Sequence, residues 1–416
     1  MKIIPVFICA LCLCVRPAAA GQGPEEAARE VSARIAEKPE GVAELFDKSL
    51  FRHISLEKLS EVLAGIYKEN GAVSSTVFVS SSSGSGHFFL DTEKGWRLPL
   101  ALSLDEASGK INGIFFSPAY RKDVSLKDVR ERLAALPGRT GLLVRRLGEK
   151  PENLEAHNAD AWFAVGSAFK LYVLGTMLKE GVSWEKVFRL KAGDRSLPSG
   201  RLRDWPEGSP LTAHTLAALM ISDSDNTAAD TLISALGRRT IEGDLAALGH
   251  SDPARLKPFL KTSEMFKLKS GTENALKYLN LPAEEKYGFL ASLERTPLSL
   301  EAFTKSPFGV DKIEWFASPS DLCRLMEYFS GKEGGKAREI LALNPGLTIP
   351  RETLVYAGYK GGSEPGVLSM TWLLKNKKSE WLCLSASWND DKDDLKESEF
   401  FGLLQSALNA LGDSGK

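Results

Sequence analysis

The stretch AVGSAFKLYVLG, residues 164–175, places a single lysine, Lys170, inside an otherwise apolar run. Such a run is typical of a buried helix, and an ammonium group is costly to remove from water. A buried lysine therefore needs a partner, loses its proton or has a chemical task. Ser167 lies three residues earlier, and positions i and i+3 share one face of a helix. The stretch thus predicts an amine beside a hydroxyl at the start of a buried helix.

Two further motifs follow this helix along the chain. In the segment SDNTAAD, residues 224–230, the first three residues, Ser224, Asp225 and Asn226, fall between two segments with helical periodicity. The segment KGGSEPGV, residues 360–367, places a lysine before two glycines at the predicted start of a strand. Ser-x-x-Lys alone is a common pattern, but its apolar surroundings and the order of the three motifs make the set specific.

The residues SAFK, SDN and KGG, in this order, resemble the signature of class A β-lactamases and penicillin-binding proteins. The resemblance covers roughly residues 125–412, and it implies a hydrolase that works through an acyl-serine intermediate. KGGSEPGV also resembles a narrower group of two-domain serine hydrolases, in which a cystatin-like or ketosteroid-isomerase-like α+β domain precedes the β-lactamase-like one. The catalytic residues that the resemblance implies are Ser167, Lys170, Ser224, Asn226 and Lys360.

Each of these residues has an implied role. Ser167 is the nucleophile, and a neutral Lys170 takes its proton, because a serine hydroxyl is a weak nucleophile until a base acts on it. Lys360 is the second cation, whose charge lowers the pKa of Lys170. Ser224 passes a proton to the leaving nitrogen. Asn226 holds Lys170 and the substrate amide.

The remaining implied site residues position or bind. The backbone N–H groups of Ser167 and of Ser363, which is three residues after Lys360, are the expected oxyanion hole. Gly362, directly before Ser363, is grouped with them as a residue of the substrate and oxyanion region. Asp225 is expected to hold its turn by bonding backbone groups. Trp205, shortly before SDN, is either an aromatic wall of the cleft or an ordinary packing residue.

The sequence departs from the family pattern at two points. Gly361 stands where the family usually has Thr or Ser, and Ser363 is a candidate substitute for that hydroxyl. The Glu-x-x-Leu-Asn loop that carries the deacylating base in class A enzymes is missing. Glu264 and Glu273 are the only carboxylates nominated for that task, and a solvated surface position is the alternative for each. Slow deacylation is the expectation.

Composition limits the remaining functions. The chain has 416 residues, of which 43% are hydrophobic and 26% charged, with a net charge of −1. Neither the charge nor any basic block favours binding to nucleic acid. The N-terminal segment has a lysine, a 13-residue apolar run and PAAAG, which predict a signal peptide cleaved after Ala20 and an exported protein. No other stretch is long and apolar enough for a membrane span.

The predicted fold class is α+β with more than one domain. The expected organisation is a signal peptide (1–20), a helical arm (21–40), a small α+β domain (41–120) and a β-lactamase-like domain (121–416). The small domain is expected to carry a four-strand meander, at 72–82, 86–92, 96–105 and 110–118. The large domain is expected to have an antiparallel sheet flanked by helices, and an all-helical lobe.

Several questions stay open at this stage. Cys9, Cys12 and Cys14 leave with the signal peptide; Cys323 and Cys383 remain, and two buried free thiols are favoured over a disulfide. No cofactor and no metal are expected, because the histidines share no ligand spacing. A small molecule or peptide is the expected partner, and the oligomeric state is open. Two alternatives to the β-lactamase-like hydrolase remain: a D-alanyl-D-alanine carboxypeptidase or esterase, and a non-catalytic protein that binds penicillin or cell-wall peptides.

Overall fold

The computed structural model describes residues 23–82, 84–296 and 306–413. The predicted signal peptide, its cleavage point and its three cysteines lie outside these residues. The chain divides into two compact units, Met1–Ala119 and Tyr120–Lys416, and each is described by itself.

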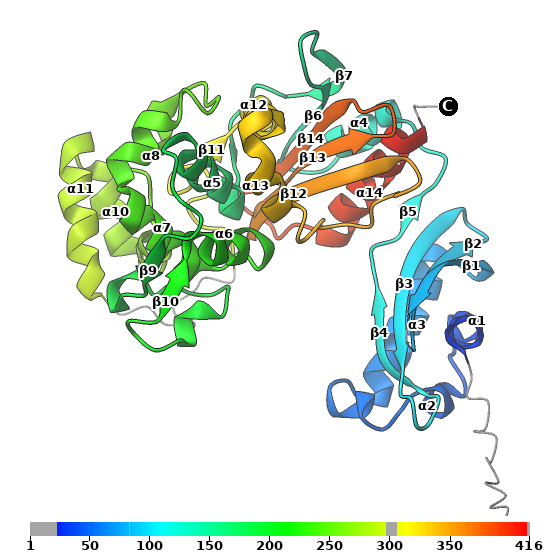
Figure 1. Ribbon diagram of the computed structural model, residues 1–416. Helices are drawn as coiled ribbons and strands as arrows, with labels where there is room; N and C mark the ends of the chain where they lie inside the picture. The colour runs from blue at the N-terminus through cyan, green and yellow to red at the C-terminus, as the bar shows by residue number, and fades with distance from the viewer. Residues whose placement is uncertain (1–22, 83, 297–305, 414–416) are drawn as a thin grey trace, which may run out of the picture. The chain divides into compact units, whose positions relative to one another are not determined.

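The first unit is a small α+β structure, as predicted. Its helices are α1 (Pro24–Arg34), α2 (Val42–Leu45), η1 (Leu50–Arg52) and α3 (Leu56–Asn70), and its strands are β1 (Val73–Ser82), β2 (Ser85–Thr92), β3 (Trp96–Leu104) and β4 (Ile111–Phe116). The four strands form an antiparallel meander in the order β1-β2-β3-β4 (Figure 1). Turns with Gly84, Gly95 and Gly109 at positive φ connect them, a conformation that glycine adopts at little cost.

The helical arm expected over residues 21–40 is instead part of this unit. Ala27, Ala28 and Val31 of α1 are buried in one core with Leu63 of α3 and Leu90 of β2. Small apolar residues at this spacing form a stripe on one helix face, which packs against the sheet. The polar residues that suggested a solvated arm occupy the other face.

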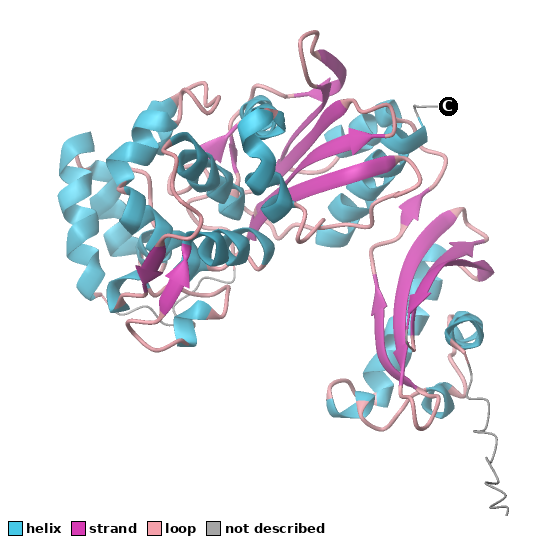
Figure 2. Ribbon diagram, in the orientation of Figure 1, coloured by secondary structure: helices cyan, strands magenta, loops and turns pink. Residues whose placement is uncertain are grey.

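The second unit has a β-lactamase-like fold, as predicted, with an antiparallel sheet between layers of helices (Figure 2). Its helices are α4 (Leu126–Ala134), η2 (Gly166–Phe169), α5 (Lys170–Lys179), η3 (Ala192–Asp194), η4 (Leu202–Asp204), α6 (Ala213–Ser222), α7 (Asn226–Leu236), α8 (Arg238–Asp244), η5 (Pro253–Leu256), α9 (Thr262–Lys269), α10 (Thr272–Asn280), α11 (Ala283–Ser292), η6 (Leu293–Arg295), α12 (Pro319–Ser330), η8 (Lys332–Gly334), α13 (Gly335–Leu341) and α14 (Glu397–Asp413). Its strands are β5 (Tyr120–Arg121), β6 (Arg139–Arg146), β7 (Glu152–His157), β8 (Phe163–Ala164), β9 (Val187–Arg189), β10 (Pro210–Thr212), β11 (Phe316–Ala317), β12 (Leu354–Glu364), β13 (Val367–Asn376) and β14 (Trp381–Asn389).

The main sheet has the order β12-β13-β14-β6-β7 and all of its pairs are antiparallel. Alternate residues of each strand point to opposite faces, so Leu142 and Val144 lie in one core while Leu143 lies in the other. The first core contains α4 and α14. The second is continuous with the helical lobe, and α5 runs through it.

Three local predictions for this sheet were wrong. Lys360 lies near the end of the eleven-residue strand β12, not at the start of a strand. Its neighbouring glycines carry no side chain that would indicate a strand, so the pattern was weak. The segment ADAWFAV, residues 159–165, has the composition of a strand and was expected to be one, but it contributes only the two-residue strand β8, which pairs with β11 outside this sheet. The strand β7, which is largely polar, was not predicted.

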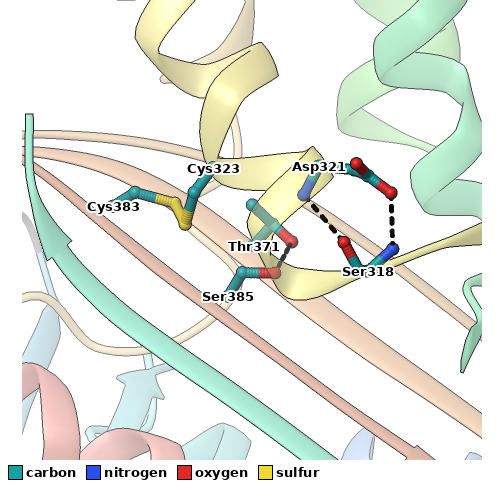
Figure 3. Close-up of a disulfide and its surroundings, with 6 residues drawn as sticks. All are labelled: Ser318, Asp321, Cys323, Thr371, Cys383 and Ser385. Atoms are coloured by element: carbon teal, nitrogen blue, oxygen red, sulfur yellow. Dashed lines mark hydrogen bonds between the residues drawn. A yellow bond between two sulfur atoms is a disulfide. The ribbon is translucent and has the colours of Figure 1, made fainter. Parts of the chain in front are cut away.

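The expectation of two free thiols was also wrong. Cys323 of α12 and Cys383 of β14 form a disulfide, with their Cα atoms 5.6 Å apart (Figure 3). Beside it, Thr371 and Ser385 share a hydrogen bond of 2.9 Å between β13 and β14. Ser318 and Asp321 form the capping box that starts α12. Because the disulfide closes a loop of 60 residues, chain entropy alone predicts about 4 kcal/mol of stabilisation.

Candidate active site

Ser167 lies in η2, the short helix that leads into α5. Every residue from Phe163 to Met177 is buried except Ser167, which is half-buried. Among the residues that the structure describes, no group hydrogen-bonds to the Ser167 Oγ. The helix thus presents one reachable hydroxyl on an otherwise closed apolar element.

Ser224 occupies the turn between α6 and α7 in a left-handed conformation, with φ of 53°. A non-glycine residue in this region costs about 1–2 kcal/mol, so its surroundings must hold it there. The Ser224 carbonyl accepts hydrogen bonds from Lys170 Nζ (2.7 Å) and Ser199 Oγ (2.7 Å). This strained turn brings both the carbonyl and the hydroxyl of Ser224 to the end of the buried lysine.

Two buried lysines converge on the Ser224 hydroxyl. Lys170 Nζ lies 3.2 Å from Ser224 Oγ, and Lys360 Nζ lies 3.1 Å from the same atom. Lys170 Nζ also donates to Asn226 Oδ1 at 2.6 Å, and Lys360 Nζ donates to the Gly361 carbonyl at 2.5 Å. The structure therefore brings Lys170, Ser224, Asn226 and Lys360 together from three separate parts of the chain.

Neither amine has a carboxylate among these partners. Burial, and then the charge of Lys360, lowers the pKa of Lys170 well below its ordinary value, although Asp230 and Asp225 act in the opposite direction. Burial lowers the pKa of Lys360 to about 7. A lysine that is neutral near physiological pH has a lone pair and can accept a proton.

Asn226 and Asp225 tie this cluster to the loop that precedes α6. Asn226 Nδ2 donates to the Leu197 carbonyl at 2.8 Å. Asp225 caps α7 by accepting from Ala228 N (2.9 Å), and its other oxygen accepts from the N–H groups of Arg201 (2.8 Å) and Leu202 (2.9 Å). These four side-chain hydrogen bonds all go to backbone groups, and the fifth joins Asn226 to Lys170. The side chains of Asp225 and Asn226 therefore hold the turn in one conformation.

Gly200 makes the approach of this loop possible. A Cβ at this position would collide with the Asp225 carboxylate, and its φ of 97° is unfavourable for other residues. Neither Gly200 nor Ser199 was predicted as a site residue. Glycine and serine in a loop are common, and nothing in their sequence pattern distinguishes these two.

The strand β12 passes directly over Ser167. A Cβ on Gly362 would collide with the Val165 carbonyl and with Ser167 N. A Cβ on Gly166 would lie 3.2 Å from Ser363 N. β12 is the edge strand of the sheet, so part of its backbone is not used by β13. The amide nitrogens of Ser167 and Ser363 thus lie on the two sides of a contact that only glycine permits.

The position of Tyr359 explains why glycine, and not the usual threonine or serine, stands at position 361. A Cβ on Gly361 would collide with the Tyr359 hydroxyl, and the Tyr359 ring packs 4.9 Å from the Trp372 ring. Threonine or serine at position 361 would require this ring to move. The missing hydroxyl is therefore coupled to a tyrosine two residues earlier, which the sequence analysis did not identify.

The other predicted residues lie outside this cluster. Trp205 is 40% exposed. Its backbone N–H donates to the Leu202 carbonyl, and its backbone carbonyl accepts from the Arg195 side chain. Glu264 is held by Arg238 and by Lys261 N at the start of α9. Glu273 pairs with Lys277 on the surface of α10. The structure gives neither glutamate a bond to Ser167 or the lysines.

One buried acid near the lysines was missed. Asp230 of α7 is completely buried and accepts from Thr262 N (2.6 Å), Thr262 Oγ1 (2.8 Å) and Ser263 N (2.9 Å). Burial raises its pKa. It lies one helical turn after Asn226 within SDNTAAD, and this spacing was the available signal. Asp230 joins the start of α9 to the helix that carries the site.

Within the described residues, no group of His, Cys, Asp and Glu side chains is arranged to hold a metal ion. No helix in the same part of the chain is both long and apolar enough to cross a membrane.

Residues 125–327 match the model of the β-lactamase enzyme family. The match includes Ser167, Lys170, Ser224 and Asn226 and ends before Lys360. The predicted resemblance of the second unit to β-lactamase-like enzymes is thereby confirmed.

Solved structures similar to this chain include a β-lactamase from Sphaerobacter thermophilus (20% identity, 69% of this chain and 96% of that one, TM-score 0.48). Others are a β-lactamase from Chitinophaga pinensis (16% identity, 70% and 98%, TM-score 0.48) and PBP-A (15% identity, 70% and 96%, TM-score 0.46). A comparison with proteins of curated function finds no match.

Proposed function

We propose that this chain is an exported serine hydrolase that forms an acyl-serine intermediate on Ser167 with β-lactams or related amides and esters. One observation carries the proposal: two buried lysines without a carboxylate partner meet at Ser224 Oγ, and one of them, Lys170, lies three residues after the single half-buried hydroxyl of a buried helix. Ion pairing does not account for these lysines, whereas proton transfer does.

The hydrogen bonds of Lys170 support its role as the base. Its partners Ser224 O and Asn226 Oδ1 are acceptors, so each needs an N–H from the amine. A neutral amine has two N–H groups and one lone pair. The third partner, Ser224 Oγ at 3.2 Å, is a hydroxyl that can donate to this lone pair, so a neutral Lys170 satisfies all three contacts. The same lone pair is the proposed acceptor of the Ser167 Oγ proton.

The proposed acylation then proceeds in balanced steps. Ser167 Oγ attacks the carbonyl carbon while its proton moves to Lys170 Nζ. The negative oxygen that forms is stabilised by the N–H groups of Ser167 and Ser363. As the carbon–nitrogen bond breaks, Ser224 Oγ–H gives its proton to the leaving nitrogen and recovers one from Lys170. Lys360, 3.1 Å from Ser224 Oγ, stabilises negative charge on that oxygen during the relay.

Slow deacylation is part of the proposal. Each oxygen of the Asp225 and Asp230 carboxylates already accepts from at least one N–H group. Glu264 and Glu273 bind cations elsewhere. None of these four is placed to activate water for attack on the acyl-serine, so the acyl-enzyme is expected to accumulate.

Export is proposed on two grounds. The N-terminal segment has the pattern of a signal peptide. The disulfide between Cys323 and Cys383 supports an oxidising compartment, since disulfides persist mainly outside the cytosol.

Intact-mass spectrometry tests the proposal. The full chain is incubated separately with a penicillin, a cephalosporin and a p-nitrophenyl ester, and the adduct is followed over time. The expected result is one covalent adduct per molecule, which maps to Ser167 and decays slowly. Rapid release with no adduct would contradict slow deacylation, and no reaction with any of the three would contradict the proposed chemistry.

A further inference from the structure

A second buried lysine cluster lies at the end of the strand that passes over Ser167. Lys269, the last residue of α9, donates to Glu314 Oε1 at 2.7 Å and also to Glu364 Oε1. The three side chains are nearly inaccessible, with exposed fractions of 7%, 0% and 9%. Two carboxylates thus share one ammonium group away from water. The proposed mechanism assigns this lysine–diglutamate cluster no task.

Glu314 connects the cluster to the segment that contains Ser167. The next residue, Trp315, accepts a hydrogen bond at its carbonyl from Val165 N at 3.0 Å. Its indole stacks on Phe169, with ring centroids 3.9 Å apart and an angle of 13° between the rings. Val165 and Phe169 lie on either side of Ser167, two residues away in each direction. A shift of Glu314 would therefore move the segment that carries the Ser167 N–H.

Glu364 connects the cluster to the other half of the expected oxyanion hole. It follows Ser363 directly at the end of β12, and it pairs with Val367 of β13. Lys269 therefore joins the two segments on which the Ser167 and Ser363 N–H groups lie. Effective stabilisation of an oxyanion requires both donors within about 2.7–3.1 Å of the same point, so the spacing of these segments matters.

The charge state of the cluster is also determined by its surroundings. Burial, and then the adjacent Glu314 carboxylate, raises the pKa of Glu364 well above its ordinary value. Burial opposes the charge of Lys269, but the two glutamates outweigh it and raise the pKa of this lysine. The charged groups that face Glu364 are Lys269 from α9 and Glu314 before β11. Two carboxyl groups share one ammonium in this cluster, and a single proton kept by the glutamate pair makes its net charge zero, the state that burial favours.

We infer that the lysine–diglutamate cluster is a positioning device for the hydrolase proposed above, on which this inference rests: it sets the spacing of the Ser167 and Ser363 N–H groups, and it does so only while one glutamate keeps its proton. Loss of that proton at alkaline pH leaves a second negative charge buried without a cation of its own. The carboxylates then repel each other, and the end of β12 moves away from Ser167.

The test measures acylation by a fluorescent penicillin from neutral to alkaline pH. Glu364→Gln replaces the protonated carboxyl group by a neutral amide of the same shape that cannot ionise. This variant is expected to acylate about as fast as the parent protein at neutral pH and progressively faster than the parent as pH rises. Taking the ratio of the two rates removes the titration of Lys170 and Lys360, which both proteins share.

Glu364→Ala and Lys269→Met remove the connection altogether. A misplacement of about 1 Å can lower a rate by about 10²-fold, so the maximal acylation rate is expected to fall by up to about that factor. The penicillin concentration for half-maximal rate should change little, because the cluster does not contact substrate. Glu339→Gln, which alters an exposed pair with Lys336 on α13, is the matched control. Thermal unfolding of each variant reports whether it is folded.

The outcomes separate the two hypotheses. If the parent protein is not acylated at Ser167, the proposed function fails, and the inference fails with it. If the parent is acylated but the Glu364→Gln ratio stays constant across pH, the cluster does not act through its proton. If Glu364→Gln is as slow as Glu364→Ala at neutral pH, the neutral carboxyl form is not the active one. Either of the last two results overturns the inference while the proposed function stands.

Discussion

Two buried lysine clusters in the second unit differ in their partners far more than in their burial. Lys170 and Lys360 are 0% and 4% exposed, and Lys269 is 6% exposed. The hydrogen-bond acceptors of the first two are carbonyl, amide and hydroxyl oxygens. Lys269 instead contacts two carboxylates. Burial therefore lowers the pKa of Lys170 and Lys360, whereas the carboxylates raise the pKa of Lys269.

The comparison shows that burial alone does not decide what a lysine does. Without a negative partner, a buried amine is stabilised in its neutral form, which can take a proton. With two carboxylates, the same group stays an ammonium ion and joins segments of the chain. Lys170 and Lys360 meet at Ser224 Oγ, whereas Lys269 contacts Glu364 at the end of the strand that covers Ser167. The predictions below test this division, beginning with the largest effect.

Removal of the nucleophile should abolish covalent chemistry. Ser167→Ala is expected to show no adduct with a fluorescent penicillin or a fluorophosphonate, since Ser167 carries the one half-buried hydroxyl of the helix that contains Lys170, whereas the Ser224 hydroxyl is held between the two lysines. A peptide map of the parent protein identifies the labelled serine. Labelling of the variant, or a label on another serine of the parent, would show that Ser167 is not the nucleophile.

Loss of the base should slow acylation by about 10²–10⁴-fold. Lys170→Ala removes the lone pair but leaves Ser167 in place, so labelling is expected to persist at a much lower rate. Stopped-flow fluorescence with excess penicillin measures this rate. Lys277→Ala, on the exposed face of α10, is the control and should be unaffected. An unchanged rate in Lys170→Ala across neutral pH would mean that another group takes the proton.

A methyl group at the contact between β12 and η2 should lower acylation by about 10²-fold, as a displaced oxyanion donor would. Gly362→Ala introduces a Cβ that collides with Val165 O and Ser167 N. Gly193→Ala is the matched control, because a Cβ there meets nothing within 4 Å. Both proteins are compared by acylation rate and by circular dichroism. Equal rates would show that Ser167 and Ser363 do not form the hole.

Stability should respond to pH in opposite ways at the two clusters. Lys360 has a pKa of about 7 when folded and near 10.5 when unfolded, so the unfolded chain binds the extra proton between these values. Its burial therefore costs most at or below pH 7, and the cost falls as pH rises toward 10.5. The pKa of Lys269 is raised on folding, so its contribution is present below 10.5 and is lost above the folded value.

Methionine at each position measures this difference. Lys360→Met is expected to raise the midpoint of thermal unfolding at pH 7 by at least about 3 °C, with a smaller gain at pH 10. Lys269→Met leaves the buried glutamate pair without its cation and should be destabilising by about 3–5 kcal/mol. Differential scanning calorimetry at both pH values provides the midpoints. Destabilisation of Lys360→Met that grows toward neutral pH would reverse the assignment of the first cluster.

Several features of this protein followed from short-range pattern. The apolar run around Lys170 predicted a buried helix, and the cost of burying an ammonium group predicted that this lysine has a partner or a chemical task. The spacing of Ser167 and Lys170 placed them one turn apart, and alternating strands predicted the meander of the first unit. SDN and KGG indicated the family, and with it the β-lactamase-like arrangement of helices and sheet.

The rest depends on contacts between residues far apart in the chain. Nothing local indicates that Lys360 approaches Ser224, or that Cys323 and Cys383 come within bonding distance. Lys269, Glu314 and Glu364 each read as ordinary surface residues, and only the packing of α9 against the end of β12 removes them from water. Local sequence determines helix periodicity and turn conformation, because these depend on neighbours within a few residues. The pKa of a buried amine depends on which oxygen atoms, from residues far apart in the sequence, surround it. Only the tertiary structure therefore decides which lysine can act as a base and which one joins two segments by ion pairs.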